Sequence, residues 1–290
     1  MAVREYGKIL VYPATGRLIF ATDFHGQLAD FQRLAARFTA RRARGEDLYL
    51  LFAGDFVHGP RPAQPGRWLV DDESPALLDA LQALLDAHPG RVHSLLGNHE
   101  HAHLGGMPTR KFYRGIDDDV TALERRLGPA RAAQARALFR SFSLLALAPC
   151  GVLFSHAAPN LALEPGLLHR LATARFEQRD DALLQLLWPR AVPDERMDEI
   201  LAALRFKGIQ PRIAAYGHEI IPSGVDRSSL RQIVVSTSFA VADRFKTFLE
   251  LDLSGSYADT AALREGRELV RLYPERCVGR RPLVSQDVTV

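Results

Sequence analysis

Three short hydrophobic runs in the first hundred residues each end in a cluster of polar side chains. The runs cover residues 18–22, 48–53 and 92–96. Short apolar runs bounded by glycine are typical of buried strands in a layered α/β domain. Between them, hydrophobic residues recur at helical spacing over 28–45 and 74–90, which predicts two β-α crossovers and a parallel core.

The rest of the chain continues as a mixture of helices and strands. We expect a strand at 9–12, a loop at 104–116, a helix at 117–142 whose aspartates favour its N-terminus, a hairpin of 144–148 with 152–154, helical segments within 161–208, a strand at 213–216, and strands of antiparallel character at 232–236 and 247–253. The residues from about 260 onward are polar, and the pattern assigns them no role.

Composition is that of an ordinary globular protein. Hydrophobic residues make up 47% of the 290 residues and charged residues 24%, with a net charge of +3. Two cysteines give no disulfide framework. Residues 1–8 lack the apolar core of a signal peptide, and no apolar run reaches the length of a membrane span. We therefore expect a cytoplasmic protein without a membrane partner. We also expect no nucleic-acid partner, because the arginine clusters are typical of solvated helix ends and tails. We interpret 1–290 as one domain, with a core at 17–253 and a C-terminal extension at 254–290.

The polar residues that follow the predicted strands are the types that bind hard divalent metal ions. These candidate ligands are Asp23, His25, Asp55, Asn98, His156 and His218. Asp23 and His25 lie two positions apart at one strand end, so a slight bend lets both reach one ion. Asp55 follows the next strand, and a single carboxylate can bridge two ions, the second of which Asn98 and the later histidines complete. Such a pair serves hydrolytic phosphoryl transfer, and His99 remains to protonate the leaving oxygen.

These clusters, taken in order, resemble the sequence blocks of a known family. The blocks are Asp23-Phe24-His25-Gly26-Gln27, Gly54-Asp55-Phe56-Val57, Gly97-Asn98-His99-Glu100, Ser155-His156-Ala157-Ala158-Pro159 and Gly217-His218. Together they are similar to those of calcineurin-like metallophosphoesterases, especially the phosphoprotein phosphatase branch, which includes serine/threonine phosphatases and bacterial diadenosine tetraphosphatases. The segment Leu186-Leu187-Trp188-Pro189 is similar to that branch's Leu-Trp-Ser-Asp segment. The resemblance spans roughly residues 17–253.

The resemblance implies an α/β fold, a four-layer α-β-β-α sandwich with two metal ions at the strand ends. It assigns Asp23, His25 and Asp55 to the first ion, and it makes His99 the general acid. The second ion would be held by Asp55, Asn98, His156 and His218. Asn98 would also contact substrate. Mixed carboxylate, imidazole and amide ligation suits Mn²⁺, although Fe and Zn pairs also fit.

The second block departs from the family pattern. After its valine the family continues Asp-Arg-Gly, whereas this chain has His58-Gly59-Pro60-Arg61. His58 therefore stands where an aspartate usually orients the acid histidine, and we expect His99 to be a weaker or differently tuned acid. The phosphate-clamping arginine is missing from its position, and Arg61 is the nearest candidate for it. Three arginines compete for the role of the family's second clamp: Arg190, Arg196 and Arg205.

For several other histidines and one tryptophan, we expect a structural position and no catalytic or metal-binding role. We expect His101 and His103 to face solvent in a loop and His88, His93 and His169 to lie on the surface. Trp188 is expected in the core. His58 itself could be an extra ligand, a proton shuttle, a group behind the ligands or a surface residue.

The sequence thus predicts a dinuclear metal-dependent phosphoesterase that uses metal-activated water. A phosphorylated serine/threonine protein is the first choice of substrate and a nucleotide such as diadenosine tetraphosphate the second. A non-catalytic metal-binding relative is a further alternative because of the altered second block. A phosphodiesterase or nuclease would need a more basic cleft, against which the modest net charge argues. The sequence does not decide the oligomeric state.

Overall fold

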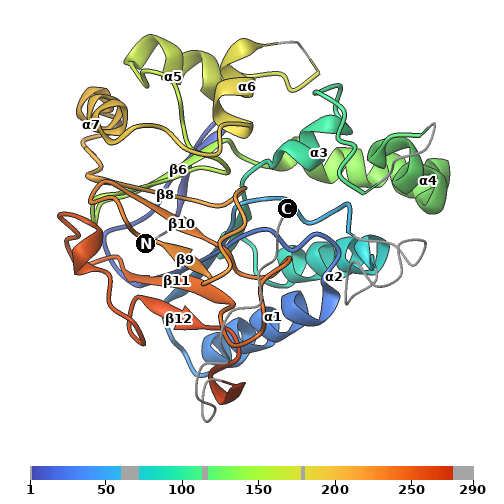
Figure 1. Ribbon diagram of the computed structural model, residues 1–290, viewed down its shortest axis with the longest axis horizontal. Coiled ribbons are helices and arrows are strands. Elements are labelled where there is room, and N and C mark those ends of the chain that lie inside the picture. The colour runs from blue at the N-terminus through green and yellow to red at the C-terminus, as the bar shows by residue number, and fades with distance from the viewer. Residues whose placement is uncertain (1, 60–71, 113–116, 178–179, 277–290) are drawn as a thin grey trace, which may run out of the picture.

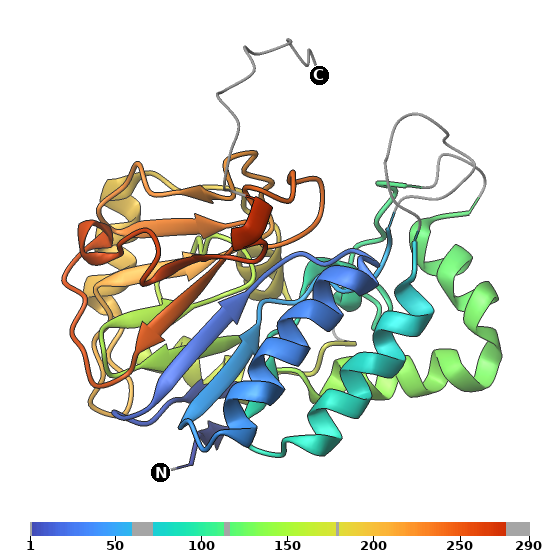
Figure 2. The ribbon, with the colours of Figure 1, turned by 90° about the horizontal axis from the view of Figure 1, so that it is seen from below.

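The computed structural model describes residues 2–59, 72–112, 117–177 and 180–276. These residues form two β-sheets with helices outside them (Figure 1). A five-stranded sheet has the strand order β12-β11-β3-β4-β5, and a seven-stranded sheet has the order β1-β2-β6-β7-β8-β10-β9. Figure 2 shows α1, α2 and α4 together on one side of the sheets. In the part of the chain described, no helix has both the length and the hydrophobicity needed to cross a membrane.

The strands are β1 (Arg4–Tyr6), β2 (Ile9–Val11), β3 (Arg17–Ala21), β4 (Leu48–Phe52), β5 (Val92–Ser94), β6 (Leu145–Ala148), β7 (Val152–Phe154), β8 (Ile213–Tyr216), β9 (Val225–Asp226), β10 (Gln232–Val235), β11 (Thr247–Asp252) and β12 (Leu269–Arg271). The helices are α1 (Leu28–Ala43), α2 (Ser74–Ala87), α3 (Asn98–Ala102), α4 (Asp119–Ser141), α5 (Pro165–Ala172), α6 (Asp181–Leu187) and α7 (Asp194–Ala203).

Alternation along β3 shows how the layers are built. Leu18 and Phe20 belong to the core between the two sheets, where the Phe20 ring lies 5.0 Å from that of Phe154 on β7. Ile19 and Ala21 point the other way, into the core shared with the buried face of α1. Successive strand residues face opposite sides, so each sheet buries both faces. The predicted α/β fold with two sheets between helical layers is confirmed.

The parallel strands place the polar loops at one edge. β3, β4 and β5 run parallel, and in the other sheet β7 and β8 run parallel, so the loops after all five strands meet. Hydrogen bonds join the sheets there: Thr22 Oγ1 donates to Val235 O at 2.6 Å and His156 Nδ1 donates to Ala53 O at 2.8 Å. The loops are therefore held against one another.

Some elements differ from those predicted. The helix expected over 117–142 is α4, but it bends at Gly128, which has a φ of 73°. The next residue, Pro129, has no N–H to continue the helical hydrogen bonds. β1, β9 and α3 were not predicted. β12 lies within the segment to which the sequence assigned no role, and it pairs antiparallel with β11 at the sheet edge. β10 is antiparallel only to β9, since it runs parallel to β8.

Candidate metal centre

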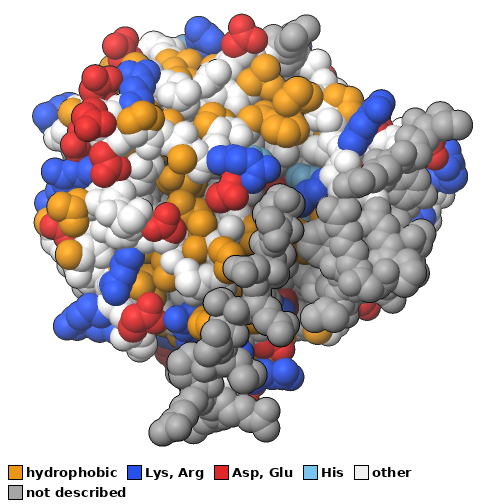
Figure 3. Space-filling view, in the orientation of Figure 1, with side chains coloured by type: hydrophobic (Ala, Val, Ile, Leu, Met, Phe, Trp, Pro, Cys, Tyr) orange, Lys and Arg blue, Asp and Glu red, His pale blue; other side chains and the backbone are white. Residues whose placement is uncertain are grey.

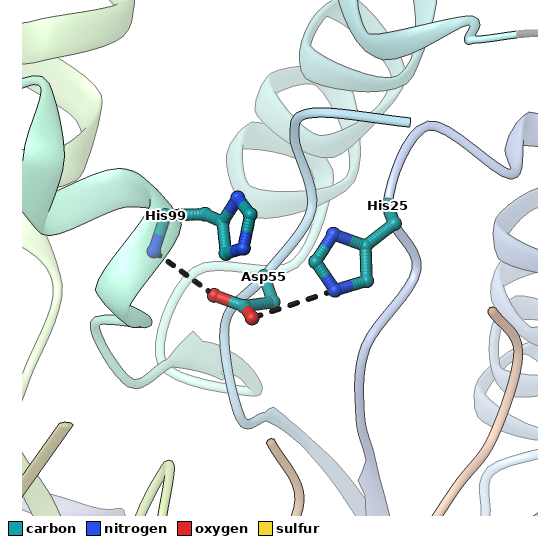
Figure 4. A group of neighbouring side chains, drawn as sticks. All are labelled: His25, Asp55 and His99. Carbon is teal, nitrogen blue, oxygen red and sulfur yellow. Dashed lines mark hydrogen bonds and ion pairs between the residues drawn. The ribbon is translucent and has the colours of Figure 1, made fainter. Parts of the chain in front are cut away.

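Asp55, in the loop after β4, lies at the centre of the site. Its Oδ2 is 3.5 Å from His25 Nε2, and its Oδ1 is 3.6 Å from His156 Nε2. The backbone N–H of His99 donates to Oδ1 at 3.2 Å. Figure 4 shows the Asp55 carboxylate between His25 and His99. Since His156 follows a strand of the other sheet, this one carboxylate contacts residues from both sheets.

Backbone carbonyls fix the ring protons of His25 and His156. The Nδ1–H of His25 donates to Val57 O at 3.1 Å, and the Nδ1–H of His156 donates to Ala53 O at 2.8 Å. Burial lowers the pKa of both imidazoles, to about 4 for His156. A neutral imidazole has one N–H, so each Nε2 carries a lone pair toward the Asp55 carboxylate. Imidazole lone pairs that converge on a carboxylate in this way can bind a metal cation placed between them.

The side chain of Asn98, the first residue of α3, adds a further acceptor. Its Oδ1 lies 3.0 Å from His156 Nε2 and 3.2 Å from His218 Nδ1, and both Asp55 oxygens are also at 3.2 Å. Either a cation or the amide NH₂ turned to this position would satisfy these four atoms. The donor set of amide oxygen, carboxylate and imidazole fits a hard or borderline divalent ion.

Asp23 and His218 complete the rim of the site. The backbone N–H of His218 donates to both carboxylate oxygens of Asp23 at 3.1 Å. Burial and then the nearby Asp55 raise the pKa of Asp23, and burial raises that of Asp55. Burial, followed by the charge of His156, lowers the pKa of His218. Without a cation, burial thus favours the neutral forms of both the carboxyl groups and the imidazole. A bound metal would favour the ionised carboxylates instead.

Two groups of potential ligand atoms share Asp55. One contains His25, Asp55 and His99, the other Asp55, His156 and His218, and within each group the ligand atoms lie within 4.8 Å of one another. The structure therefore brings the predicted ligands to one place. The first group contains His99 where the resemblance implied Asp23. Which side chains bind metal stays a prediction.

Several of these residues have left-handed backbone conformations. The φ angles are 54° for Asp23, 44° for His25, 56° for Asp55 and 67° for His218. Such conformations cost about 1–2 kcal/mol per residue that is not glycine. They persist because neighbouring loops hold them; His25 N donates to Asp55 O at 2.8 Å, for example. Strain concentrated at one edge of the sheets is typical of functional sites.

Glu100 and Gly97 shape the loop beneath Asp55, and the sequence analysis gave them no role. Glu100 is fully buried, and its carboxylate accepts hydrogen bonds from the backbone of Asp55, Phe56, Val57 and Gly97. A Cβ on Gly97 would lie 2.3 Å from Asp55 Oδ1. The signal was present, since a glutamate at the third position of a helix often bonds back to the N-cap residue.

Three histidines that we expected at the surface are buried. His101 and His103 are 4% and 6% exposed, because α4 and the segment at Phe176 cover the turn after α3; His101 Nε2 contacts Phe176 O at 3.1 Å. His93 is 8% exposed and its Nδ1 lies 3.4 Å from the Tyr12 hydroxyl. The predictions for these three were wrong. His88 is half-buried and His169 exposed, and Trp188 is half-buried against the core.

His58 is also buried, 1% exposed, and it lies behind the acid candidate. Its Nδ1 is 2.8 Å from His99 Nδ1, and its Nε2 is 2.9 Å from His103 Nε2. Of the roles left open for His58, a surface position is excluded. Its contact with the His99 ring agrees with the position behind the acid candidate that the sequence resemblance implied.

Lysine and arginine side chains border the site. Lys111 Nζ lies 3.4 Å from His25 Nε2 and 4.7 Å from the centre of the Phe239 ring. Arg190, after Trp188, forms an ion pair with Glu219, the residue following His218. Figure 3 shows lysine and arginine side chains next to the small exposed histidine surface. Arg61 lies outside the described residues. Arg196 instead pairs with Glu199 on α7, and Arg205 is exposed beyond that helix.

Comparisons with known proteins agree with this geometry. The family model of the calcineurin-like phosphoesterases matches residues 16–227. A protein serine/threonine phosphatase from Saccharomyces cerevisiae superposes with a TM-score of 0.55 at 20% identity, over 78% of this chain and 68% of its own. A mutant cold-active protein tyrosine phosphatase superposes with a TM-score of 0.57 at 16% identity, over 87% and 80%. A comparison with curated proteins gave no match.

The solved structures share the fold at low identity, and the family model covers most of the chain, including all six predicted ligands and the acid candidate. The chain belongs to the calcineurin-like phosphoesterase family.

Proposed function

We propose that the protein is a dinuclear metal-dependent phosphatase that hydrolyses phosphomonoesters by direct attack of water. The observation that carries the proposal is the position of Asp55 between the Nε2 lone pairs of His25 and His156, at 3.5 and 3.6 Å. Asp23 would join His25 and Asp55 around one ion. Asn98, His156 and His218 would join Asp55 around the other. Mn²⁺ is our first choice of metal, because oxygen and imidazole ligands suit it.

The bound metals would supply an activated water molecule and neutralise phosphoryl oxygens. The chain's own residues would then position substrate and manage protons. His99 Nδ1 is engaged with His58, which leaves Nε2 to protonate the leaving oxygen. The His99 backbone N–H bonds Asp55, so that the acid and the shared carboxylate keep a fixed relation. Positioning of this kind supplies much of the rate enhancement in phosphoryl transfer.

Lys111 and Arg190 are our candidates for binding the phosphate group. Lys111 brings a positive charge against His25, where burial lowers the pKa of its ammonium group and the two site carboxylates oppose that shift. Arg190 lies beside His218, whose imidazole pKa its charge helps to lower. Both side chains would compensate for the arginine absent after Val57. A lysine acts as a point charge, without the paired hydrogen bonds of a guanidinium group.

A phosphorylated serine or threonine in a protein is the proposed substrate, supported by the resemblance of the sequence blocks to the phosphoprotein phosphatase branch. The structural neighbours are named as both serine/threonine and tyrosine phosphatases. A phosphotyrosine substrate therefore belongs in the same assay.

The test is turnover of the metal-stripped protein with and without added Mn²⁺. p-Nitrophenyl phosphate reports chemistry, and phosphoserine, phosphothreonine and phosphotyrosine peptides and diadenosine tetraphosphate report specificity. Asp55→Asn should abolish turnover and His99→Asn should reduce kcat by about 100-fold or more. His169→Asn on the exposed face of α5 is the matched control and should retain full activity.

We expect metal-dependent hydrolysis with the highest kcat/KM on phosphoserine or phosphothreonine peptides. Preference for the dinucleotide would replace the proposed substrate by a nucleotide. Turnover that persists in the Asp55→Asn protein would contradict the dinuclear mechanism.

A further inference from the structure

A chain of hydrogen-bonded side chains leads from His99 to the protein surface. His99 Nδ1 meets His58 Nδ1 at 2.8 Å, His58 Nε2 meets His103 Nε2 at 2.9 Å, and His103 Nδ1 meets Glu124 Oε1 at 2.9 Å. Glu124, on α4, is paired through its second oxygen with Arg136 at 2.7 Å. The three histidines are buried, whereas 28% of the Glu124 side chain is exposed.

Glu124 is a carboxylate, and this fixes the direction of every bond in the chain. Burial raises its pKa, but hydrogen bonds from His103 and Arg136 outweigh burial and the pKa is lowered. A carboxylate only accepts, so His103 must carry its proton on Nδ1. Burial lowers the pKa of His103, so its Nε2 has a lone pair and accepts from His58 Nε2–H.

The proton position on His103 in turn determines the proton positions on His58 and His99. With its proton on Nε2, a neutral His58 offers a lone pair at Nδ1, which accepts from His99 Nδ1–H. Thr109 Oγ1, 3.3 Å from the same nitrogen, is a second donor to that lone pair. The backbone of His58 is held as well, because its N–H donates to Ser74 Oγ at 3.1 Å. His99 is thereby left with its Nε2 directed away from the chain.

We propose that Glu124 is the positioning carboxylate of His99: acting through His103 and His58, it fixes the tautomer and the ring orientation of the acid histidine. This proposal rests on the proposed role of His99 as general acid. With His58 in place of the aspartate that the resemblance implies, no carboxylate in the described part of the chain is hydrogen-bonded to His99 Nδ1. His58 and His103 connect that nitrogen to the Glu124 carboxylate instead. Glu124 touches neither substrate nor metal, so its contribution is indirect.

A third metal ion is the rival explanation for part of this cluster. Ligand atoms of His58, His99 and Asp119 lie within 4.8 Å of one another. However, the 2.8 Å separation of the two Nδ1 atoms is a hydrogen-bond distance. Asp119 also accepts hydrogen bonds from the backbone of Lys111 and Phe112 at 2.8 and 3.2 Å. The observations favour the hydrogen-bonded chain, and metal analysis decides between the two.

The informative variant is Glu124→Gln. Arg136 can only donate, so the glutamine oxygen turns to Arg136 and its NH₂ group turns to His103. That reverses each bond in the chain, and His58 Nδ1 would then carry a proton directed at His99. The protonated form of His99 then loses the acceptor of its Nδ1–H, so a smaller fraction of His99 carries the proton that the leaving oxygen needs. The matched control is Glu195→Gln, the same change at an exposed position on α7.

Leaving-group dependence separates a positioning role from a structural one. Phenyl phosphate has a more basic leaving oxygen than p-nitrophenyl phosphate and therefore needs the acid more. For the Mn²⁺-loaded Glu124→Gln protein we expect kcat on phenyl phosphate to fall about 10-fold or more, and on p-nitrophenyl phosphate by less than about 3-fold, with KM unchanged. In Glu124→Ala, added formate should restore part of the lost activity, because Glu124 is partly exposed.

Imidazole ¹⁵N spectra of the zinc-loaded protein, with His99→Asn used for assignment, give a readout that does not depend on activity. We expect the proton of His99 on Nδ1 in the unaltered protein and a shift of that signal in Glu124→Gln. An unchanged His99 spectrum together with equal loss on both substrates would overturn the proposal. So would a third metal per chain that His58→Asn removes.

The His99→Asn protein distinguishes the two levels of the argument. If His99→Asn loses the same factor in kcat on phenyl phosphate as on p-nitrophenyl phosphate, the general-acid role under the proposed function is wrong. The ¹⁵N spectra alone then test the tautomer of His99. If His99→Asn shows the leaving-group dependence and Glu124→Gln does not, the acid role stands and the proposal for Glu124 fails.

Discussion

The carboxylate of Glu100 holds the backbone of Asp55, accepting its N–H at 2.7 Å, and the same carboxylate accepts the N–H of Phe56 at 2.8 Å. Glu100 belongs to the short helix after β5, and Asp55 to the loop after β4. One buried side chain therefore locks two site loops together. The left-handed conformation of Asp55 depends on this support.

We expect Glu100→Gln to lower the free energy of unfolding by about 1–3 kcal/mol, because a glutamine NH₂ group would face backbone N–H donors in a buried place. Urea denaturation measures the change. Glu195→Gln on the surface should be within about 0.5 kcal/mol of the unaltered protein. Equal stabilities of the two variants would show that the loop does not depend on the Glu100 carboxylate.

Gly97→Ala should abolish activity. Its Cβ would lie 2.3 Å from Asp55 Oδ1 and 2.6 Å from Glu100 Oε2, so the carboxylate between the histidines must move. Gly166→Ala, near the start of α5, is the control, because its Cβ meets no atom within 4 Å and φ is not left-handed. Initial rates with p-nitrophenyl phosphate compare the two. Full activity of Gly97→Ala would contradict the position assigned to Asp55.

Metal affinity should rise with pH. The pKa values of Asp23 and Asp55 are raised, chiefly by burial, so both carboxyls stay protonated above the ordinary range near pH 4 in the metal-free protein. A metal binds their deprotonated forms and releases those protons. Calorimetric titrations with Mn²⁺ between pH 5 and 8, in buffers of different ionisation enthalpy, should show tighter binding and declining proton release as the pH increases. Affinity independent of pH would mean that these carboxyls are not ligands.

Asp30→Asn should destabilise the protein by about 3 kcal/mol, because it leaves a buried lysine with less compensation. Asp30 Oδ2 accepts from Lys246 Nζ at 2.7 Å and its Oδ1 accepts from the Tyr273 hydroxyl at 2.6 Å, so the residue joins α1 to the segments just before β11 and just after β12. Thermal or urea unfolding gives the value. The exposed pair of Asp79 with Arg131 is the matched comparison, and Asp79→Asn should change stability by less than about 1 kcal/mol.

Lys111→Met should raise KM for p-nitrophenyl phosphate about 10-fold and change kcat less, if the ammonium group beside His25 binds the phosphate. Lys207→Met, at an exposed turn after α7, should leave KM unchanged. Steady-state kinetics at saturating Mn²⁺ separate the two constants. A fall in kcat alone would assign Lys111 to a different step.

Much of the site could be predicted from sequence because its residues follow strands. Asp23, Asp55 and His156 come directly after apolar runs, and parallel strands necessarily bring such positions to one edge. The family resemblance then supplied the order of the ligands and the layered fold. The proximity of these residues needed no knowledge of side-chain packing.

Packing between distant segments explains what the sequence missed. His101 and His103 are buried because α4 and the region of Phe176 cover them, and no local pattern reports that cover. β12 is a short edge strand that depends on β11 for its hydrogen bonds. The chain from His58 to Glu124 combines residues from three parts of the sequence, and only the fold brings them together.

The central claim is that Asp55 is shared by two metal ions, and metal stoichiometry tests it most directly. Elemental analysis after equilibration with Mn²⁺ and removal of free metal should give two ions per chain for the unaltered protein and fewer than one for Asp55→Asn, with Asp79→Asn unchanged. Two ions retained by Asp55→Asn, or a single ion in the unaltered protein, would contradict the shared site.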